Sequence, residues 1–155
     1  MIAPGTAFPD FTLPDQNDKL HSLEEYAGKW LVVYFYPRDN TAGCSLEASS
    51  FASLISQYAG LDGAVIGVSA DSVKSHAKFA EKLGLNFTLL SDADHALLEK
   101  TGVWQKKKMA GREYMGIVRS TVIVDPKGVV RAAWTKVKVD GHAEDVLAKL
   151  KELKG

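Results

Sequence analysis

Residues 29–36, which read KWLVVYFY, constrain the fold more than any other segment. β-Branched and aromatic residues follow one another there with little alternation, which is typical of a strand buried on both faces of a sheet. The next segment, 37–43, is rich in helix and strand breakers, and apolar residues then recur at helical spacing over 45–59. This order predicts the start of a βαβ unit with a right-handed crossover.

The rest of the chain continues to alternate strands and helices. We expect further strands at 64–69, 87–90, 120–124 and 129–134, and further helices at 72–83, 92–100 and 142–153. Residues 11–13 and 20–22 are expected to form a small hairpin, whereas 104–116 shows no period and is expected to be a loop. The turn 125–128 makes the last two strands antiparallel. The order therefore predicts a thioredoxin-like α/β fold, with a mixed central sheet flanked by helices, an N-terminal β-hairpin extension and one domain over 1–155.

Charge and composition exclude several classes of protein. Lys plus Arg and Asp plus Glu both total 19, so the net charge is zero, which argues against binding to nucleic acid or to acidic lipid. No apolar run is long enough to span a membrane, and the N-terminus lacks the pattern of a signal peptide. Cys44 is the one cysteine, so no internal disulfide is possible, and a reducing, cytoplasmic location is expected.

Cys44 lies where the first buried strand turns into the first long helix. Ligands of open α/β sheets tend to bind at the carboxyl ends of the strands. Unpaired backbone N–H groups and the helix dipole at a helix start favour a thiolate, which is the nucleophilic form of cysteine. The alternative is that Cys44 is a small buried hydrophobe, as many lone cysteines are. From Cys44 alone the two interpretations are about equally supported.

The segment around Cys44 resembles a known family. Pro37, Thr41 and Cys44 form the pattern P-x-x-x-T-x-x-C after an apolar strand, and YFYPRDNTAGCSLEASSF is similar to the active-site segment of peroxiredoxins. The resemblance is to the peroxiredoxin Q, or bacterioferritin comigratory protein, branch. It extends along nearly the whole chain, through PGTAFPDFTLPD, DSVKSHAKFAEKLGLNF, LLSDAD, GREYMGIVRSTVIVDPKG and KVKVDGHAEDVL.

The resemblance implies a role for each matching residue. Cys44 matches the peroxidatic cysteine, and Thr41 matches the hydroxyl that hydrogen-bonds the thiolate and the peroxide. Pro37 matches the proline that shields the sulfur from water, and Arg119 matches the active-site arginine. Glu47, one turn into the helix, is a weaker candidate for a supporting role. Without the resemblance, Arg119 would be read as a solvated strand-edge charge and Thr41 as a helix N-cap.

Ser49 departs from the pattern of many relatives, which carry a resolving cysteine five residues after the first. Two interpretations stay open. Either this protein works with one cysteine and an external thiol, or the serine replaces a natural resolving cysteine. The rest of the motif, which is similar to that of two-cysteine relatives, slightly favours the second.

The implied activity is an antioxidant, thiol-dependent peroxidase reaction on hydrogen peroxide and alkyl hydroperoxides. The expected reductant is thioredoxin, glutaredoxin or a small thiol, and the expected state is a monomer without cofactor or metal. The histidines are scattered without metal-site spacing, and Lys106–Lys108 is expected to be a solvated loop. Two other classes stay open, namely a cysteine hydrolase, which needs a histidine base near Cys44, and a non-catalytic thioredoxin-like redox-sensing or binding module.

Overall fold

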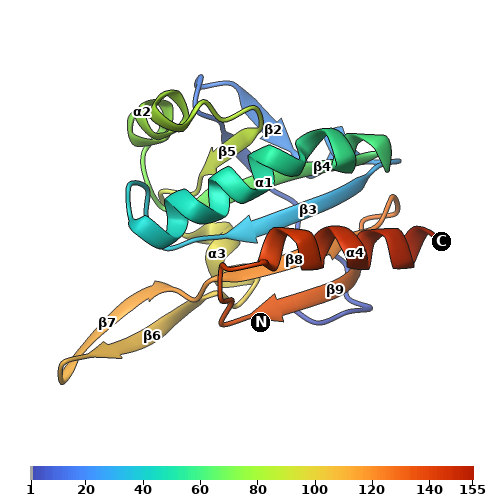
Figure 1. Cartoon of the computed structure of the whole chain (residues 1–155). Helices are drawn as coiled ribbons and strands as arrows, with labels where there is room; N and C mark the ends of the chain where they lie inside the picture. Colours follow the sequence, from blue (N-terminus) through green and yellow to red (C-terminus); the bar gives the residue numbers. More distant parts are fainter. Residues whose placement is uncertain (1) are drawn as a thin grey trace.

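The computed structural model describes residues 2–155 and contains a five-stranded mixed sheet with strand order β5-β4-β3-β8-β9 (Figure 1). Its strands are β3 (Trp30–Phe35), β4 (Gly63–Ser69), β5 (Thr88–Ser91), β8 (Ser120–Val124) and β9 (Val130–Thr135). The helices are α1 (Ala42–Gly60), α2 (Val73–Leu83), α3 (Ala96–Lys100) and α4 (His142–Lys154), with a short 3-10 helix at Leu23–Tyr26. The pairs β1 (Thr12–Pro14) with β2 (Leu20–Ser22) and β6 (Trp104–Met109) with β7 (Arg112–Ile117) form two separate two-stranded sheets. The predicted thioredoxin-like mixed sheet and N-terminal hairpin are confirmed.

The central strand β3 is buried along its whole length, as its apolar sequence predicts. It pairs in parallel with β4 and antiparallel with β8. Its alternate side chains supply two cores: Trp30, Val32 and Tyr34 pack with residues of α1, α2 and α4, whereas Leu31, Val33 and Phe35 pack with α3 and the N-terminal segment. Helices α1 and α4 lie side by side on one face of the sheet (Figure 1). The strand therefore fixes where α1 begins, at the end of the sheet next to the β3–α1 loop.

Most predicted elements are confirmed, with shifts at their ends. Helix α2 begins after Ser72, whose hydroxyl accepts from the Ser75 N–H, and it ends at Gly84, whose φ is 61°. Helix α1 begins at Ala42, three residues earlier than predicted, so Cys44 belongs to its first turn. Helix α3 is shorter than the predicted 92–100, because residues 92–95 form a turn that ends with a left-handed His95.

The loop predicted for 104–116 is wrong: β6 and β7 form an antiparallel hairpin that extends away from the body of the protein (Figure 1). Its strands show no apolar alternation because most of their residues are exposed on both faces. The two turn residues, Ala110 and Gly111, both have positive φ (51° and 78°), as a tight hairpin turn requires. Ala110 is an unusual residue for such a turn, so the sequence gives a weak hairpin signal. No helix in the described part of the chain is long and apolar enough to cross a membrane.

Gly67 is expected to be essential for packing in the sheet. It pairs with Tyr34 across β3 and β4, and a Cβ placed there would lie 2.7 Å from Tyr34 Cζ and 2.9 Å from Leu89 Cδ2. Gly67→Ala should therefore lower the free energy of unfolding in urea by about 1–3 kcal/mol, as overpacking of a core typically does.

Gly60→Ala is the matched control, because Gly60 is helical and a Cβ there meets no atom within 4 Å. This variant should gain roughly 0.5–1 kcal/mol from helix propensity. Equal stabilities of the two variants would contradict the close packing of Tyr34 on Gly67.

Candidate active site

Cys44 is the third residue of α1, three residues after the N-cap Thr41, and only 1% of it is exposed. The Ser45 N–H donates the first helical hydrogen bond to the Thr41 carbonyl at 2.9 Å, so the backbone N–H groups of 42–44 precede the helical ladder. These free N–H groups and the helix dipole place positive partial charge beside the sulfur. The prediction that Cys44 stands at a helix start is confirmed.

Arg119 contacts Cys44 from a different part of the chain. It lies between β7 and β8, and its Nη2 donates to Cys44 Sγ at 3.2 Å. Its Nη1 donates to Glu47 Oε1 at 2.5 Å, so one guanidinium joins two side chains that stand three residues apart on α1. A Cβ on Gly43 would lie 3.2 Å from Arg119 Nη2, and the glycine thus permits this close approach. The structure brings Cys44, Glu47 and Arg119 together.

Glu47 is a buried carboxyl with one free oxygen. Its Oε2 is buried and has no hydrogen-bond partner among the residues that the structure describes, and 1% of the residue is exposed. Burial raises the pKa of Glu47 to about 7, although the charge and hydrogen bond of Arg119 oppose the increase. Burial also opposes ionisation of Arg119, but the charges of Glu47 and Cys44 raise the pKa of its guanidinium. Arg119 therefore stays a cation.

Three other predicted residues make no hydrogen bond to Cys44, Glu47 or Arg119 within the described residues. Thr41 is exposed at the N-cap, and its hydroxyl donates to the Arg38 carbonyl at 3.1 Å rather than capping the helix. Pro37 is half-buried in the β3–α1 loop, and Ser49 is exposed on α1. A cysteine hydrolase would need a histidine base beside Cys44. Among residues 2–155, no histidine hydrogen-bonds to Cys44.

Two features near the site were missed from the sequence. Lys107 was expected in a solvated loop. Its Nζ instead donates to the Ile117 carbonyl at 2.7 Å. Burial and the nearby Arg119 charge lower the pKa of Lys107. The second feature is a cluster of the buried Asp39 and His76 with the half-buried Asp71. Asp39 is more than 30 residues from the other two in the sequence, and the only available signal was its place in the loop that leads to Cys44.

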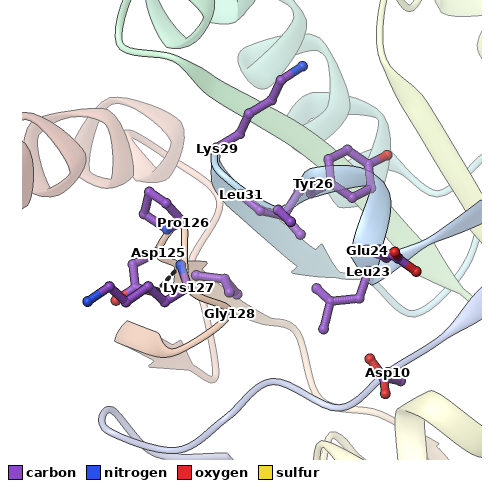
Figure 2. A pocket seen from close by; sticks show the side chains of 12 residues that line it. Asp10, Leu23, Glu24, Tyr26, Lys29, Leu31, Asp125, Pro126, Lys127 and Gly128 are labelled. Atoms are coloured by element: carbon purple, nitrogen blue, oxygen red, sulfur yellow. Dashed lines mark hydrogen bonds between the residues drawn. The ribbon is translucent and has the colours of Figure 1, made fainter.

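A well-formed cavity lies away from this group. About 200 Å³ in volume, it is lined by residues at the start of β3, by Leu23 to Ala27 and by the turn Asp125–Gly128 (Figure 2). These residues are at the opposite end of β3 from the β3–α1 loop. Cys44, Glu47 and Arg119 do not line this cavity.

Comparisons with known proteins give a family match and several similar proteins of known name or structure. The model of the AhpC/TSA family matches residues 4–133. Peroxiredoxin Bcp of Bacillus subtilis is 44% identical over 96% of this chain and 95% of its own, and a putative peroxiredoxin bcp of Coxiella burnetii is 44% identical over 96% and 99%. The solved bacterioferritin comigratory protein of Xanthomonas campestris, described for its alkyl peroxide reduction activity, is similar with a TM-score of 0.90, 43% identity and coverage of 94% and 92%. A cysteine-to-serine mutant of Xylella fastidiosa PrxQ reaches a TM-score of 0.95 at 39% identity, with coverage of 100% and 99%.

The buried carboxyl of Glu47 predicts a pH dependence of stability. Between pH about 4.5 and about 7 the unfolded chain ionises Glu47 while the folded protein still holds the proton. A folded-state pKa above the unfolded one gives stability that is complete below pH 4.5 and is lost as pH rises through 7. This residue should therefore lower the free energy of unfolding of the wild type by up to about 3 kcal/mol between pH 4.5 and 7. Glu47→Gln cannot titrate at this position and should not show this loss.

Urea unfolding at several pH values measures this difference. Glu113→Gln is the control, since Glu113 is an exposed residue of β7 that pairs only with the exposed Lys106. It should follow the wild type at every pH. A Glu47→Gln curve parallel to the wild type across the window would show that Glu47 ionises as an exposed carboxyl does.

Proposed function

Because the chain belongs to the AhpC/TSA family, in the Bcp branch of the peroxiredoxins, we propose that Cys44 is the residue through which it acts as a thiol-dependent peroxidase. The observation that carries this proposal is the 3.2 Å contact between Arg119 Nη2 and Cys44 Sγ. The sulfur thus stands against a permanent cation at a helix start, and both features place positive charge beside it. The substrates are hydrogen peroxide and alkyl hydroperoxides.

The reaction is a two-electron transfer. The thiolate of Cys44 attacks one oxygen of the peroxide, the O–O bond breaks, and the other oxygen leaves with the bonding pair and takes a proton as water or an alcohol. Cys44 becomes a sulfenic acid, which two electrons from an external thiol pair return to the thiol with release of water. With no second cysteine in the chain, excess peroxide carries Cys44 on to sulfinic acid.

Arg119 stabilises the charge that develops in this step. As the S–O bond forms, negative charge grows on the leaving oxygen, and a preorganised donor aimed at it lowers the barrier. The guanidinium suits this because it stays charged and presents several N–H donors in a fixed plane. Glu47 binds the other arm of Arg119 and holds its orientation.

Thr41 and Pro37 complete the proposed site from the β3–α1 loop. The Thr41 hydroxyl is exposed and can rotate from the Arg38 carbonyl toward an incoming peroxide oxygen. Pro37 offers no N–H and limits the access of water to the sulfur. Glu47 is a positioning residue, whereas Cys44, Thr41 and Arg119 meet the peroxide.

The reductant is an external thiol, from thioredoxin, glutaredoxin or a small molecule, because the chain holds no other cysteine. A cytoplasmic monomer is part of the same proposal, and the even balance of 19 basic and 19 acidic residues agrees with a protein that binds neither nucleic acid nor acidic lipid. A redox-sensing module is the alternative function. It would oxidise at Cys44 but would not be turned over by thiols.

Replacement of Arg119 tests the proposed charge stabilisation. Arg119→Met should lower the second-order rate constant of Cys44 with hydrogen peroxide by about 10²-fold or more, as the loss of one transition-state donor does. Arg131→Met is the matched control, because Arg131 is on β9 and pairs with Asp125. Cys44→Ser should abolish turnover.

Stopped-flow measurements with a thiol reductant give these rates. Peroxide turnover in Cys44→Ser, or an unchanged rate in Arg119→Met, would contradict the assignment.

The position of Ser49 predicts how a resolving cysteine would act. Residues five apart in a helix have Cα atoms roughly 8–9 Å apart, beyond the about 7 Å that a disulfide spans. In Ser49→Cys, one equivalent of peroxide should therefore form a disulfide only with measurable loss of helix, because the first turns of α1 must unwind. The wild type should keep its helix content.

Circular dichroism and free-thiol counting before and after peroxide measure both effects. Ser53→Cys is the control, as Ser53 is exposed one turn further along α1. Its new thiol should stay free. Two free thiols in oxidised Ser49→Cys, or a disulfide without loss of helix, would refute the unwinding.

A further inference from the structure

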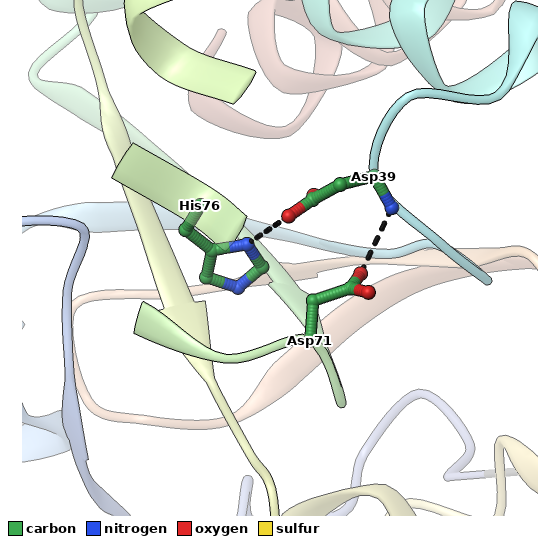
Figure 3. Close-up of side chains that lie close together, drawn as sticks. All are labelled: Asp39, Asp71 and His76. Carbon is green, nitrogen blue, oxygen red and sulfur yellow. Dashed lines mark hydrogen bonds and ion pairs between the residues drawn. The ribbon is translucent and has the colours of Figure 1, made fainter. Parts of the chain in front are cut away.

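A buried polar cluster lies beside the loop that leads to Cys44. Asp39 belongs to this loop, Asp71 follows β4, and His76 is on α2; their side chains converge in Figure 3. Asp39 is 4% exposed and His76 is 0% exposed. The cluster therefore links the β3–α1 loop to two elements that are distant in the sequence.

Both ring nitrogens of His76 face acceptors. Nδ1 is 2.7 Å from Asp39 Oδ2, and Nε2 is 3.0 Å from the Leu90 carbonyl oxygen. The ring therefore joins Asp39 of the β3–α1 loop to the backbone of β5, and its Nδ1–H is placed to donate to the Asp39 carboxylate.

Both the carboxylate and the backbone N–H of Asp39 are hydrogen-bonded. Besides His76, its carboxylate accepts from the Tyr36 hydroxyl at 2.6 Å and from the Ser75 hydroxyl at 2.8 Å. Its backbone N–H donates to Asp71 Oδ2 at 2.9 Å. Burial opposes its ionisation, but the hydrogen bonds and charge of His76 lower the pKa of Asp39 below its ordinary value.

Asp39 is in the middle of the β3–α1 loop, which also carries Pro37 and Thr41. The next residue, Asn40, has a φ of 62°, a left-handed conformation that costs free energy in a residue other than glycine. Thr41 follows as the N-cap of α1, and Pro37 precedes Asp39 by two residues. A loop with such a strained residue keeps one conformation only when its surroundings fix it, and the pair of Asp39 with His76 does so.

Resting on the peroxidase function proposed above, we propose that His76 is a positioning residue of the reaction. Through its hydrogen bond it holds Asp39, and through Asp39 it holds Pro37 and Thr41 in the places from which they act on the peroxide at Cys44. His76 does not contact the sulfur, so its effect passes through the loop.

The protonation of His76 can be observed directly in the unmodified protein. Nuclear magnetic resonance of protein labelled with ¹⁵N in histidine should show a slowly exchanging proton on Nδ1 of His76, the proton that the ring donates to Asp39. Assignment uses its loss in His76→Gln. An Nδ1 without a proton would overturn the proposal.

A pair of variants separates positioning from stability. His76→Phe removes both ring nitrogens, and His21→Phe is the matched control. The nitrogens of His21 face Asp15 Oδ2 at 2.7 Å and Glu25 Oε2 at 2.8 Å, so this second buried histidine pair lies wholly in the N-terminal segment. Both variants should lose stability, but only His76→Phe should react more slowly with hydrogen peroxide, by about 10- to 100-fold, as small misplacements of reacting groups do.

Alkylation of Cys44 by iodoacetamide shows whether the loop or the sulfur is affected. In His76→Phe the alkylation rate should stay equal or rise, because the thiolate is intact and the loop is looser. His76→Gln, whose amide can still donate to Asp39, should recover part of the peroxide rate. An unchanged peroxide rate in His76→Phe, or peroxide and alkylation rates that fall together, would overturn the proposal.

A wild-type protein that does not react with peroxide would instead refute the proposed function, and with it the positioning role. The two failures are distinguishable, because the second leaves no wild-type peroxide rate for any variant to change. If His76→Phe does not fold, the resonance experiment and His76→Gln still decide.

Discussion

The guanidinium of Arg119 joins two parts of the chain that the fold must place separately. Cys44 and Glu47 stand on the first turns of α1, whereas Arg119 precedes β8. The antiparallel register of β3 and β8 pairs Phe35 with Ser120, so Arg119 arrives at the end of β3 where the α1 loop begins. The buried strand β3 and the close approach of Gly43 to Arg119 allow these side chains to meet. A change of register by one residue would turn Arg119 to the other face.

This arrangement is expensive for stability. Glu47 buries a carboxyl with one oxygen unpartnered, and a buried ion pair often contributes less than apolar side chains of the same size. A chain selected for stability alone would place apolar residues there. The cost is explained if the pair keeps Arg119 oriented on Cys44, since a catalytic donor must be fixed before the charge develops. The buried pair of Asp39 and His76 imposes a similar cost one layer further from the sulfur.

The sequence predicts those parts whose signals are local. The run of apolar residues predicts β3. The helical period of the apolar residues, with Ser72 and Gly84 at the two ends, predicts α2. The family resemblance predicted Arg119 as an active-site residue, because a motif match identifies residue types even where their spacing in the sequence cannot show that Cys44 and Arg119 are in contact. The β6–β7 hairpin was missed because exposed strands need no apolar alternation. The contact of Asp39 with His76 was missed because 37 residues separate two polar side chains whose meeting depends on the packing of α2.

The central claim is that the fold turns an otherwise ordinary buried cysteine into a fast peroxide nucleophile. The most direct test is the second-order rate constant of wild-type Cys44 with hydrogen peroxide, measured by stopped flow at neutral pH and compared with that of free cysteine under the same conditions. We expect a rate constant at least about 10²-fold higher than that of free cysteine, the effect of one preorganised transition-state donor. A rate constant equal to that of free cysteine would contradict it, because Arg119 and the start of α1 would then do nothing for the sulfur.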